Sequence, residues 1–425
     1  MVIRALALLF AVAVVSAVSG ASVSAQSAPT LRDDGVQNMF PDGMVFRVSV
    51  DTDAPIEKLR LRYEILPDGT RASAEPEFEV SESFTATFTL EGNAPPRIYL
   101  PPGTSIEYHW EATDSNGSKV ETETATVFYD VTRFDWQPIE RDGVTIYYYS
   151  GSDADAEAML DVAADSIASM SALLGTTVEF PIKVWAYKSR DDMQPALVQR
   201  SESYEDQIIT AGVRVSSDTV LVLGNASFDT LRHELTHVVT AVAGESAFGT
   251  LPAWVDEGTA VYGQTDPGGF ESAIGSAIDR GNVLSVRSIT SYPGDPNKVT
   301  LFYGESWSLV SYLVDTYGAE EYALLFAEVK SGKRIDAAME AVYGFDQGGL
   351  EDEWRAANGL EPRATPVLEN DDQQPQDTGA PDSSDASSAD DSGSSTGSIV
   401  VIGVIGVLLL ALIVGGGLFV ARRYR

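Results

Sequence analysis

The sequence predicts an α+β protein in which a β-sandwich precedes a mixed domain of sheet and helices, with a transmembrane helix near the C-terminus. Three observations predict this order. Between about residues 40 and 150, apolar and polar residues alternate with period two. After residue 150, apolar residues recur at helical spacing around short apolar runs. Residues 399–420 then carry no charge over a length that spans a bilayer.

The first residues are typical of a secretory signal peptide, which we assign to residues 1–25. Arg4 precedes an apolar stretch, and the small residues at positions 23–25 provide a cleavage site. The alternative is an anchor that is not cleaved. We favour cleavage because the apolar stretch, residues 5–18, is short for a bilayer.

The last residues predict a tethered membrane protein. Residues 365–398 contain eight acidic residues, no Lys or Arg and almost no large apolar residue, which is typical of a disordered spacer. The transmembrane helix at 399–420 is followed by a basic tail at 421–425, which the positive-inside rule places in the cytoplasm. We therefore expect a single-pass plasma-membrane protein with its domains outside. A lipid-anchor signal that is later removed is the alternative.

Residues 27–150 predict a β-sandwich of immunoglobulin or fibronectin type. Within residues 56–65, Leu and Ile face one way and charged residues the other, and residues 106–111 alternate similarly. Several short strands at this spacing are typical of such sandwiches. His109 falls on the polar side of its strand, so we interpret it as a surface residue and not as a metal ligand. Turn signals lie at Pro67-Asp68-Gly69, Asn116-Gly117 and Asp142-Gly143.

Residues 151–364 predict the mixed domain. Its Ala-rich beginning has helical spacing, and β-branched runs follow it. The expected helices cover residues 154–174, 227–242, 305–317, 319–329 and 335–343, and the expected strand regions cover 182–187 and 213–224. The domain is expected to end near residues 354–360.

The composition excludes some functions and concentrates others. The chain has 63 Asp and Glu against 28 Lys and Arg, a net charge of -35, which argues against nucleic-acid binding. Most of these acids precede the spacer, and we interpret them as adaptation to a salty medium, with binding of a cationic substrate as the alternative. The absence of Cys excludes thiol nucleophiles and cysteine metal sites. With three His in the chain, any histidine chemistry must lie in very few places.

Two of those histidines form an H-E-x-x-H motif in the helix predicted at 227–242. His233 and His237 are four residues apart, so they project from one helix face and can bind one Zn²⁺. Glu234 is next to the first ligand, where it can take a proton from water activated by the metal. The alternative is a pair of ordinary surface histidines on an amphipathic helix.

A third ligand is expected from the segment that begins at Leu251. Asp256 and Glu257 follow the motif, and a carboxylate from a second helix would complete a His₂Glu zinc site with one open position. The two cannot both face the metal, because neighbours on a helix point about 100° apart. The residues alone leave this choice open.

The combination of HELTH at 233–237 and PAWVDEGTA at 252–260 resembles the gluzincin metallopeptidases, and in particular the bacterial peptidase MA-like family. In that family W-x-x-E-G-x-A supplies the glutamate ligand, so the resemblance implies Glu257 and not Asp256. It also implies a zincin-type fold with one zinc per chain. The resemblance extends to the preceding sandwich and to the stretch Y-x-x-S-x-S at 303–308, so it covers most of residues 40–360.

This sequence also departs from related patterns. Val261 stands where thermolysin-like enzymes carry an Asp that orients a zinc-bound histidine, so that partner is unassigned. The G-x-M-E-N signature of gluzincin aminopeptidases is missing, which leaves endo- or exopeptidase activity undetermined.

The resemblance also implies a group that stabilises the oxyanion during hydrolysis. Gluzincins use a Tyr or His after the glutamate, and no His remains here. Tyr303 is the first candidate and Tyr312 the second; packing is the alternative role for both. By analogy with the fold, residues 212–215 are expected to form the sheet edge that binds extended substrate.

These residues predict a membrane-anchored extracellular zinc metallopeptidase, with Glu234 as general base and a peptide or protein as substrate. Its expected partners include the membrane, through the C-terminal helix, but no nucleic acid. One alternative is a non-catalytic surface adhesin or receptor that retains a relic peptidase fold. Another is a zinc hydrolase that acts on non-peptide amides.

Overall fold

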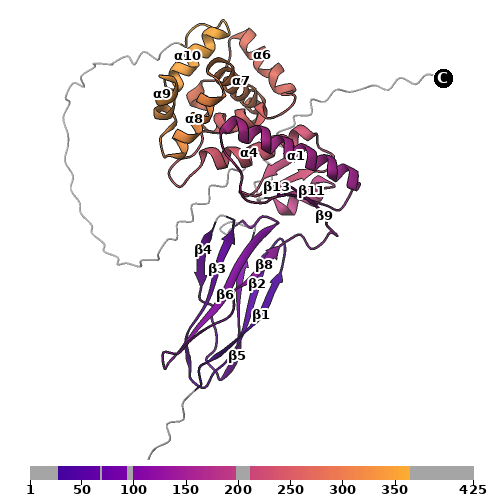
Figure 1. Cartoon of the computed structure of the whole chain (residues 1–425), viewed down its shortest axis with the longest axis vertical. Helices are drawn as coiled ribbons and strands as arrows, with labels where there is room; N and C mark the ends of the chain where they lie inside the picture. Colours follow the sequence, from indigo (N-terminus) through magenta and orange to yellow (C-terminus); the bar gives the residue numbers. More distant parts are fainter. Residues whose placement is uncertain (1–26, 68, 93–98, 198–210, 364–425) are drawn as a thin grey trace, which may run out of the picture.

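The computed structural model describes residues 27–67, 69–92, 99–197 and 211–363 (Figure 1). The predicted signal peptide, acidic tether, transmembrane helix and cytoplasmic tail lie outside these residues, so they stay predictions. Within the part that the structure describes, no helix has the length and apolar character needed to cross a membrane.

The N-terminal region is a sandwich of two antiparallel sheets (Figure 1). One sheet has the order β1-β2-β5, and the other has the order β4-β3-β6-β7, with β8 also paired to β6. Phe46, Leu61 and Trp110, which come from both sheets, are fully buried in one core. The immunoglobulin or fibronectin type of the sandwich stays a prediction. The strands are β1 (Thr30–Asn38), β2 (Gly43–Asp51), β3 (Ile56–Leu66), β4 (Thr70–Ala74), β5 (Ser83–Glu91), β6 (Thr104–Asp114), β7 (Lys119–Glu121) and β8 (Ala125–Tyr129).

His109 lies on β6 opposite Arg62 of β3. Its Nε2 atom is 3.6 Å from a carboxylate oxygen of Glu111, and its side chain is partly exposed. It is not in the group of side chains described below that could hold a metal ion, in agreement with the surface role predicted for it.

The second region is built on a mixed sheet of order β12-β13-β11-β10-β9. β10, β11 and β13 run parallel, and β9 and β12 are antiparallel edge strands. β9 and β10 precede residue 150, so the predicted boundary at 150 falls after two strands of the second sheet. Their alternation and the Asp142-Gly143 turn are the same in either sheet, which is why the pattern did not separate them. The strands are β9 (Gln137–Arg141), β10 (Val144–Tyr148), β11 (Ile182–Tyr187), β12 (Gly212–Arg214) and β13 (Thr219–Leu223).

Helices α1 and α4 cover one face of this sheet and share a core with it, and the later helices form a second core with α4 (Figure 1). The helices expected from the sequence are present, although α7 begins earlier than predicted. The helix at 269–280 was missed, because its apolar residues are few and its ends carry several glycines. The longer helices are α1 (Asp153–Leu174), α4 (Phe228–Gly244), α5 (Ala253–Tyr262), α6 (Gly269–Arg280), α7 (Val299–Tyr317), α8 (Ala319–Lys330), α9 (Ile335–Tyr343) and α10 (Gln347–Ala357). The shorter ones are α2 (Arg190–Met193), η1 (Gln194–Ala196), η2 (Val286–Ile289) and η3 (Pro296–Lys298).

The opposite face of the sheet contacts the sandwich. Trp185 of β11 is buried there and stacks on Phe128 of β8. The ammonium group of Lys183 donates a hydrogen bond to the carbonyl oxygen of Gly103, at 2.5 Å. The sandwich therefore lies against the sheet face away from α4, and it leaves the α4 side to the helices.

Candidate metal centre

Helix α4 carries the H-E-x-x-H motif. Ser227 caps it by accepting a hydrogen bond from the backbone N–H of Thr230, as expected for a Ser before an apolar helix. Leu231, Leu235 and Val238 pack the helix against the sheet. The residues between them place His233 and His237 on the side towards α5, where both side chains are fully buried.

Helix α5 presents the candidate carboxylate ligand, and its sequence explains how it is held. The indole of Trp254 is buried and donates to the side-chain oxygen of Gln347 in α10, at 3.1 Å. At Gly258, an added Cβ would lie 2.3 Å from the carbonyl oxygen of Ser306, so only glycine lets α5 approach α7 so closely. These two contacts fix the helix face that carries Glu257.

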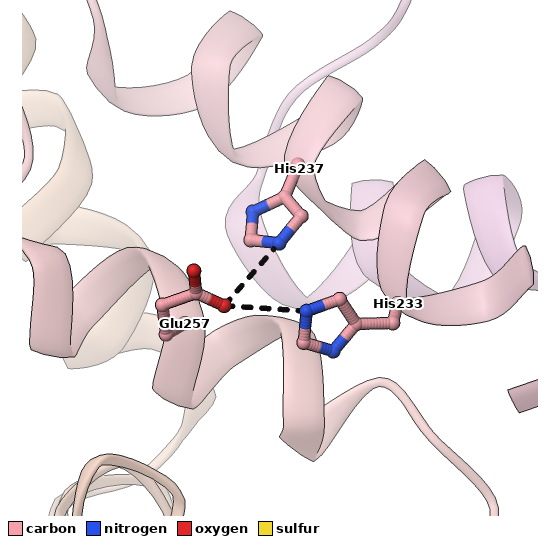
Figure 2. Close-up of side chains that lie close together, drawn as sticks. All are labelled: His233, His237 and Glu257. Atoms are coloured by element: carbon pink, nitrogen blue, oxygen red, sulfur yellow. Dashed lines mark ion pairs between the residues drawn. The ribbon is translucent and has the colours of Figure 1, made fainter. Parts of the chain in front are cut away.

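The structure brings His233, His237 and Glu257 together (Figure 2). The Oε2 atom of Glu257 lies 3.2 Å from Nε2 of His233 and 3.5 Å from Nε2 of His237. One ligand atom from each residue lies within 4.8 Å of the others, so the three could hold a metal ion. The choice of Glu257 over Asp256 agrees with this geometry.

The donor atoms of the cluster fit a metal in a further respect. His233 Nε2, His237 Nε2, Glu257 Oε2 and Glu234 Oε1 are buried, and none has a hydrogen-bond partner in the described structure. Buried polar atoms without partners are rare and costly. Two imidazoles and a carboxylate that meet in this way are a donor set that zinc prefers.

Asp256 has a different role from the one considered for it as an alternative ligand. Its Oδ1 atom lies 3.0 Å from Nδ1 of His237 and accepts a hydrogen bond from the hydroxyl of Thr240, at 2.5 Å. Burial alone would lower the pKa of His237, but the charges of Asp256 and Glu257 outweigh it and raise that pKa to about 10. A carboxylate at Nδ1 holds the imidazole with Nε2 directed towards the metal position.

Gln264 provides the corresponding contact for His233. Its side-chain amide nitrogen, Nε2, lies 3.0 Å from Nδ1 of His233. A histidine that binds metal through Nε2 carries its proton on Nδ1, so this amide accepts that proton once it is turned to present its oxygen. The partner of the zinc-binding imidazole that the sequence left unassigned is therefore, for His233, a residue that follows α5.

Glu234 faces β12 as well as the cluster. Its Oε2 atom accepts a hydrogen bond from the backbone N–H of Arg214, at 2.9 Å, which leaves Oε1 without a partner in the described structure. Burial raises the pKa of the Glu234 carboxyl to about 8. At Gly212, an added Cβ would lie 2.9 Å from Cγ of Glu234, so this glycine allows the strand to pass close to the carboxylate.

Two tyrosines contact the candidate ligand, and one of them was not anticipated. The hydroxyl of Tyr303 donates to Oε1 of Glu257 at 3.2 Å, but its side chain is fully buried. Tyr292 also donates to Oε1 of Glu257, and it is 42% exposed. Tyr312 lies on another face of α7, where its hydroxyl donates to a carboxylate oxygen of Glu353 in α10. Tyr292 belongs to no sequence motif. The one signal for it was its position in a polar loop that follows Glu257 in the chain.

Residues 162–358 match the Peptidase MA superfamily. The matched segment includes α4, α5 and every residue of the candidate cluster, and it supports a gluzincin-like peptidase. It does not extend to the sandwich, so the wider resemblance expected over residues 40–360 is matched only in part. No curated protein matches the chain.

Several solved structures are similar to parts of the chain. One is a zinc metallopeptidase of the M1 family from Deinococcus radiodurans, at 11% identity and a TM-score of 0.34, over 77% of this chain and 91% of that one. Another is the bromide derivative of BhCBM56, at 12% identity and a TM-score of 0.17, over 24% and 91%. The third is the sporulation control protein Spo0M from Bacillus subtilis, at 15% and 0.15, over 25% and 50%. Likenesses this distant carry no conclusion about the present chain.

Proposed function

We propose that the protein is a membrane-anchored extracellular zinc metallopeptidase of gluzincin type. One observation carries this proposal most of all. The unpartnered buried atoms of His233, His237 and Glu257 meet at one place, and the unpartnered oxygen of Glu234 belongs to the same motif. The Peptidase MA match over the same residues supports it.

The three ligand side chains would hold one Zn²⁺ per chain. When bound, zinc supplies a Lewis acid that polarises the substrate carbonyl and makes water acidic enough to be deprotonated near neutral pH. Asp256 contacts Nδ1 of His237 and Gln264 contacts Nδ1 of His233, which keeps the Nε2 atom of each ring directed towards the zinc position. The hydroxyls of Tyr292 and Tyr303 hold the other oxygen of Glu257, so the carboxylate is directed with Oε2 towards the histidines.

Glu234 acts as general base and then as general acid. Its Oε2 is occupied by the backbone N–H of Arg214, and Oε1 is left to accept a proton from water. Burial makes this carboxyl a better base than an exposed glutamate, because it raises the pKa. The same oxygen can return the proton to the leaving amine.

Tyr292 is the better candidate for the hydroxyl that stabilises the oxyanion. Tyr303 was the first choice from the sequence, but its side chain is fully buried and its hydroxyl donates to Glu257. Tyr292 reaches the same carboxylate from a partly exposed loop position. A hydroxyl there can turn from Glu257 to a substrate oxygen without moving the backbone, so we assign Tyr303 to the support of Glu257.

Substrate would bind as an added strand along β12. This strand is at the edge of its sheet and passes directly beside Glu234. No strand that the structure describes pairs with its outer edge, so an extended peptide can add there, beyond the Arg214 N–H that is bonded to Glu234, with a backbone carbonyl near the general base. The signal sequence, acidic tether and C-terminal apolar run support placement of this site outside the membrane on a flexible spacer.

Digestion of a peptide library tests this function. The purified protein is compared with Glu234→Gln, and the zinc content of both is measured. We expect cleavage by the wild type only, at equal zinc content. Equal cleavage by both would contradict the role of Glu234. Zinc binding without cleavage of any peptide would favour the non-peptide hydrolase or the adhesin.

A further inference from the structure

Arg214 is a buried arginine that has one ion-pair partner, Glu245, among the described residues. Its side chain is 7% exposed. The nearest carboxylate oxygen belongs to Glu245, 4.0 Å from Nη2, which is beyond hydrogen-bond distance. A guanidinium has five donors, and a buried one normally has carboxylates or carbonyls within bonding distance. The guanidinium is therefore only loosely paired with Glu245 and has donors left for a further carboxylate.

The backbone of β12 directs Arg214 to the side of the strand that faces the candidate site. Ala211 and Val215 use their backbone groups to pair with β13, so those of Gly212 and Arg214 point to the other edge, where the N–H of Arg214 donates to Glu234. Side chains two apart in a strand lie on one face. A Cβ at Gly212 would meet Thr230 and Glu234 of α4, so the Arg214 side chain lies on this α4 face too.

Further along α4, the same stripe of the helix leads from Glu234 past Ala241 to Glu245. The backbone N–H of Arg214 donates to Glu234, and its Nη2 atom lies 4.0 Å from Oε1 of Glu245, so the residue lies along this stripe. Ala241, between them, is partly exposed. Arg214 thus contacts the general base through its backbone and extends its guanidinium towards Glu245, within reach of a bound peptide.

An added strand would bring a substrate group to this guanidinium. Residues directly opposite in an antiparallel pair have Cβ atoms about 4.5–5.5 Å apart. A peptide on the free edge of β12 therefore places one side chain, or its own end, beside Arg214. A planar guanidinium matches a carboxylate through two parallel hydrogen bonds, which it cannot form with an uncharged aliphatic group.

We propose that Arg214 determines specificity by binding a carboxylate of the substrate beside the scissile bond. This inference rests on the proposed peptidase function and deepens it. The carboxylate comes from an Asp or Glu side chain or from the C-terminus of the peptide; both present the same group. The protein thus prefers acidic or C-terminally free peptides, although its own surface is strongly acidic.

Two peptide sets distinguish the sources. In the first, each position around the scissile bond carries Asp or Glu in one peptide and Asn or Gln in its twin, with all C-termini amidated. In the second, neutral peptides carry a free or an amidated C-terminus. We expect one set to show a preference for the carboxylate in kcat/KM. Arg214→Gln should reduce this preference by about 100-fold, mainly by raising KM for the peptides with the carboxylate. Its kcat/KM for the neutral twins should stay within about threefold of the wild-type value.

Two control variants separate recognition from support of the fold. Glu245→Gln removes the nearest acidic neighbour of Arg214 and should keep the preference. Arg141→Gln changes a surface arginine on β9, the opposite edge of the sheet, and should also keep it. If Arg214→Gln slows acidic and neutral peptides equally, or if the wild type shows no preference in either set, the proposal is overturned while the peptidase function stands.

A binding measurement keeps the inference testable if no peptide is cleaved. Fluorescence anisotropy compares Glu234→Gln with the double variant that also carries Arg214→Gln, using the same labelled peptides. Binding that depends on the carboxylate and is lost in the double variant supports the role of Arg214 even if the peptidase function fails. Equal binding of acidic and neutral peptides by the Glu234→Gln protein contradicts it.

Discussion

Asp256 Oδ1 lies 3.0 Å from Nδ1 of His237, so the residue just before the candidate ligand Glu257 orients one of the two histidines that face that ligand. A single turn of α5 therefore supplies both a ligand and the support for another ligand. Neighbours on a helix point in different directions. Here Asp256 faces Nδ1 of His237, and Glu257 faces Nε2 of the same ring.

This relationship predicts different losses for the two acidic residues. Asp256→Asn keeps the shape but weakens the hold on His237, so zinc affinity should fall by about 10- to 100-fold. Glu257→Gln removes a ligand and should lower the affinity much further. Competition with a chromophoric chelator measures both constants. A larger loss for Asp256→Asn than for Glu257→Gln would make Asp256 the ligand.

The buried carboxyl of Glu234 predicts a pH-dependent stability of the metal-free protein. Burial raises its pKa to about 8, whereas an unfolded chain has a value near ~4.3. Between these pH values the folded state retains a proton that the unfolded state has lost, so the free energy of unfolding falls as pH rises. Glu234→Gln lacks this effect. It should match the wild type near pH ~4 and be more stable by about 2–4 kcal/mol near pH ~8.5.

Urea unfolding in the presence of a chelator measures this difference at each pH. Glu328→Gln, on the surface of α8 beside Lys333, is the control; it keeps Glu234, so its stability should fall with rising pH as that of the wild type does. If Glu234→Gln differs from the wild type by the same amount at both pH values, the carboxyl does not titrate in this range.

Much of this site was predictable because it is local in sequence. His233, Glu234 and His237 occupy one helix turn, and the strand and helix patterns around them were correct. The partners that complete the site come from elsewhere. Gln264, Tyr292 and Arg214 reach it only through the packing of α5, a later loop and β12. Tertiary contacts of this kind leave no period in the sequence.

The boundary between the two domains was also not predictable from local sequence patterns. The hairpin of β9 and β10 has the alternation of a sandwich strand pair, yet it pairs with β11. Pairing with a strand beyond α1 is a property of the whole fold, and neither alternation nor a turn signal encodes it.

Substitution of the two tyrosines at Glu257 should have different effects on kcat. Tyr292→Phe removes the hydroxyl of the partly exposed tyrosine and should lower kcat by about 10²–10³ with little change in KM. Tyr303→Phe removes a buried hydrogen bond to a charged group, so it should cost about 1–3 kcal/mol of stability and reduce kcat less than tenfold. Steady-state rates and thermal unfolding of both variants give the comparison. A larger kcat loss in Tyr303→Phe would reverse the assignment.

Two helical glycines provide a matched test of the packing of α5. Gly258→Ala would place a methyl group 2.3 Å from the carbonyl oxygen of Ser306, so we expect a loss of about 2–4 kcal/mol and weaker zinc binding. Gly275→Ala lies on α6 with nothing within 4 Å of the added atom. It should stabilise the protein by about 0.5–1 kcal/mol. Thermal unfolding compares them, and equal effects would refute the close contact of α5 and α7.

The central claim is that two histidines and one carboxylate of this chain hold zinc. X-ray absorption at the zinc edge of the purified protein tests it most directly. We predict about one zinc per chain, with two imidazole nitrogens at about 2.0–2.1 Å and oxygen ligands at about 2.0–2.2 Å. A protein that binds no zinc, or a zinc spectrum without imidazole scattering, would contradict the account.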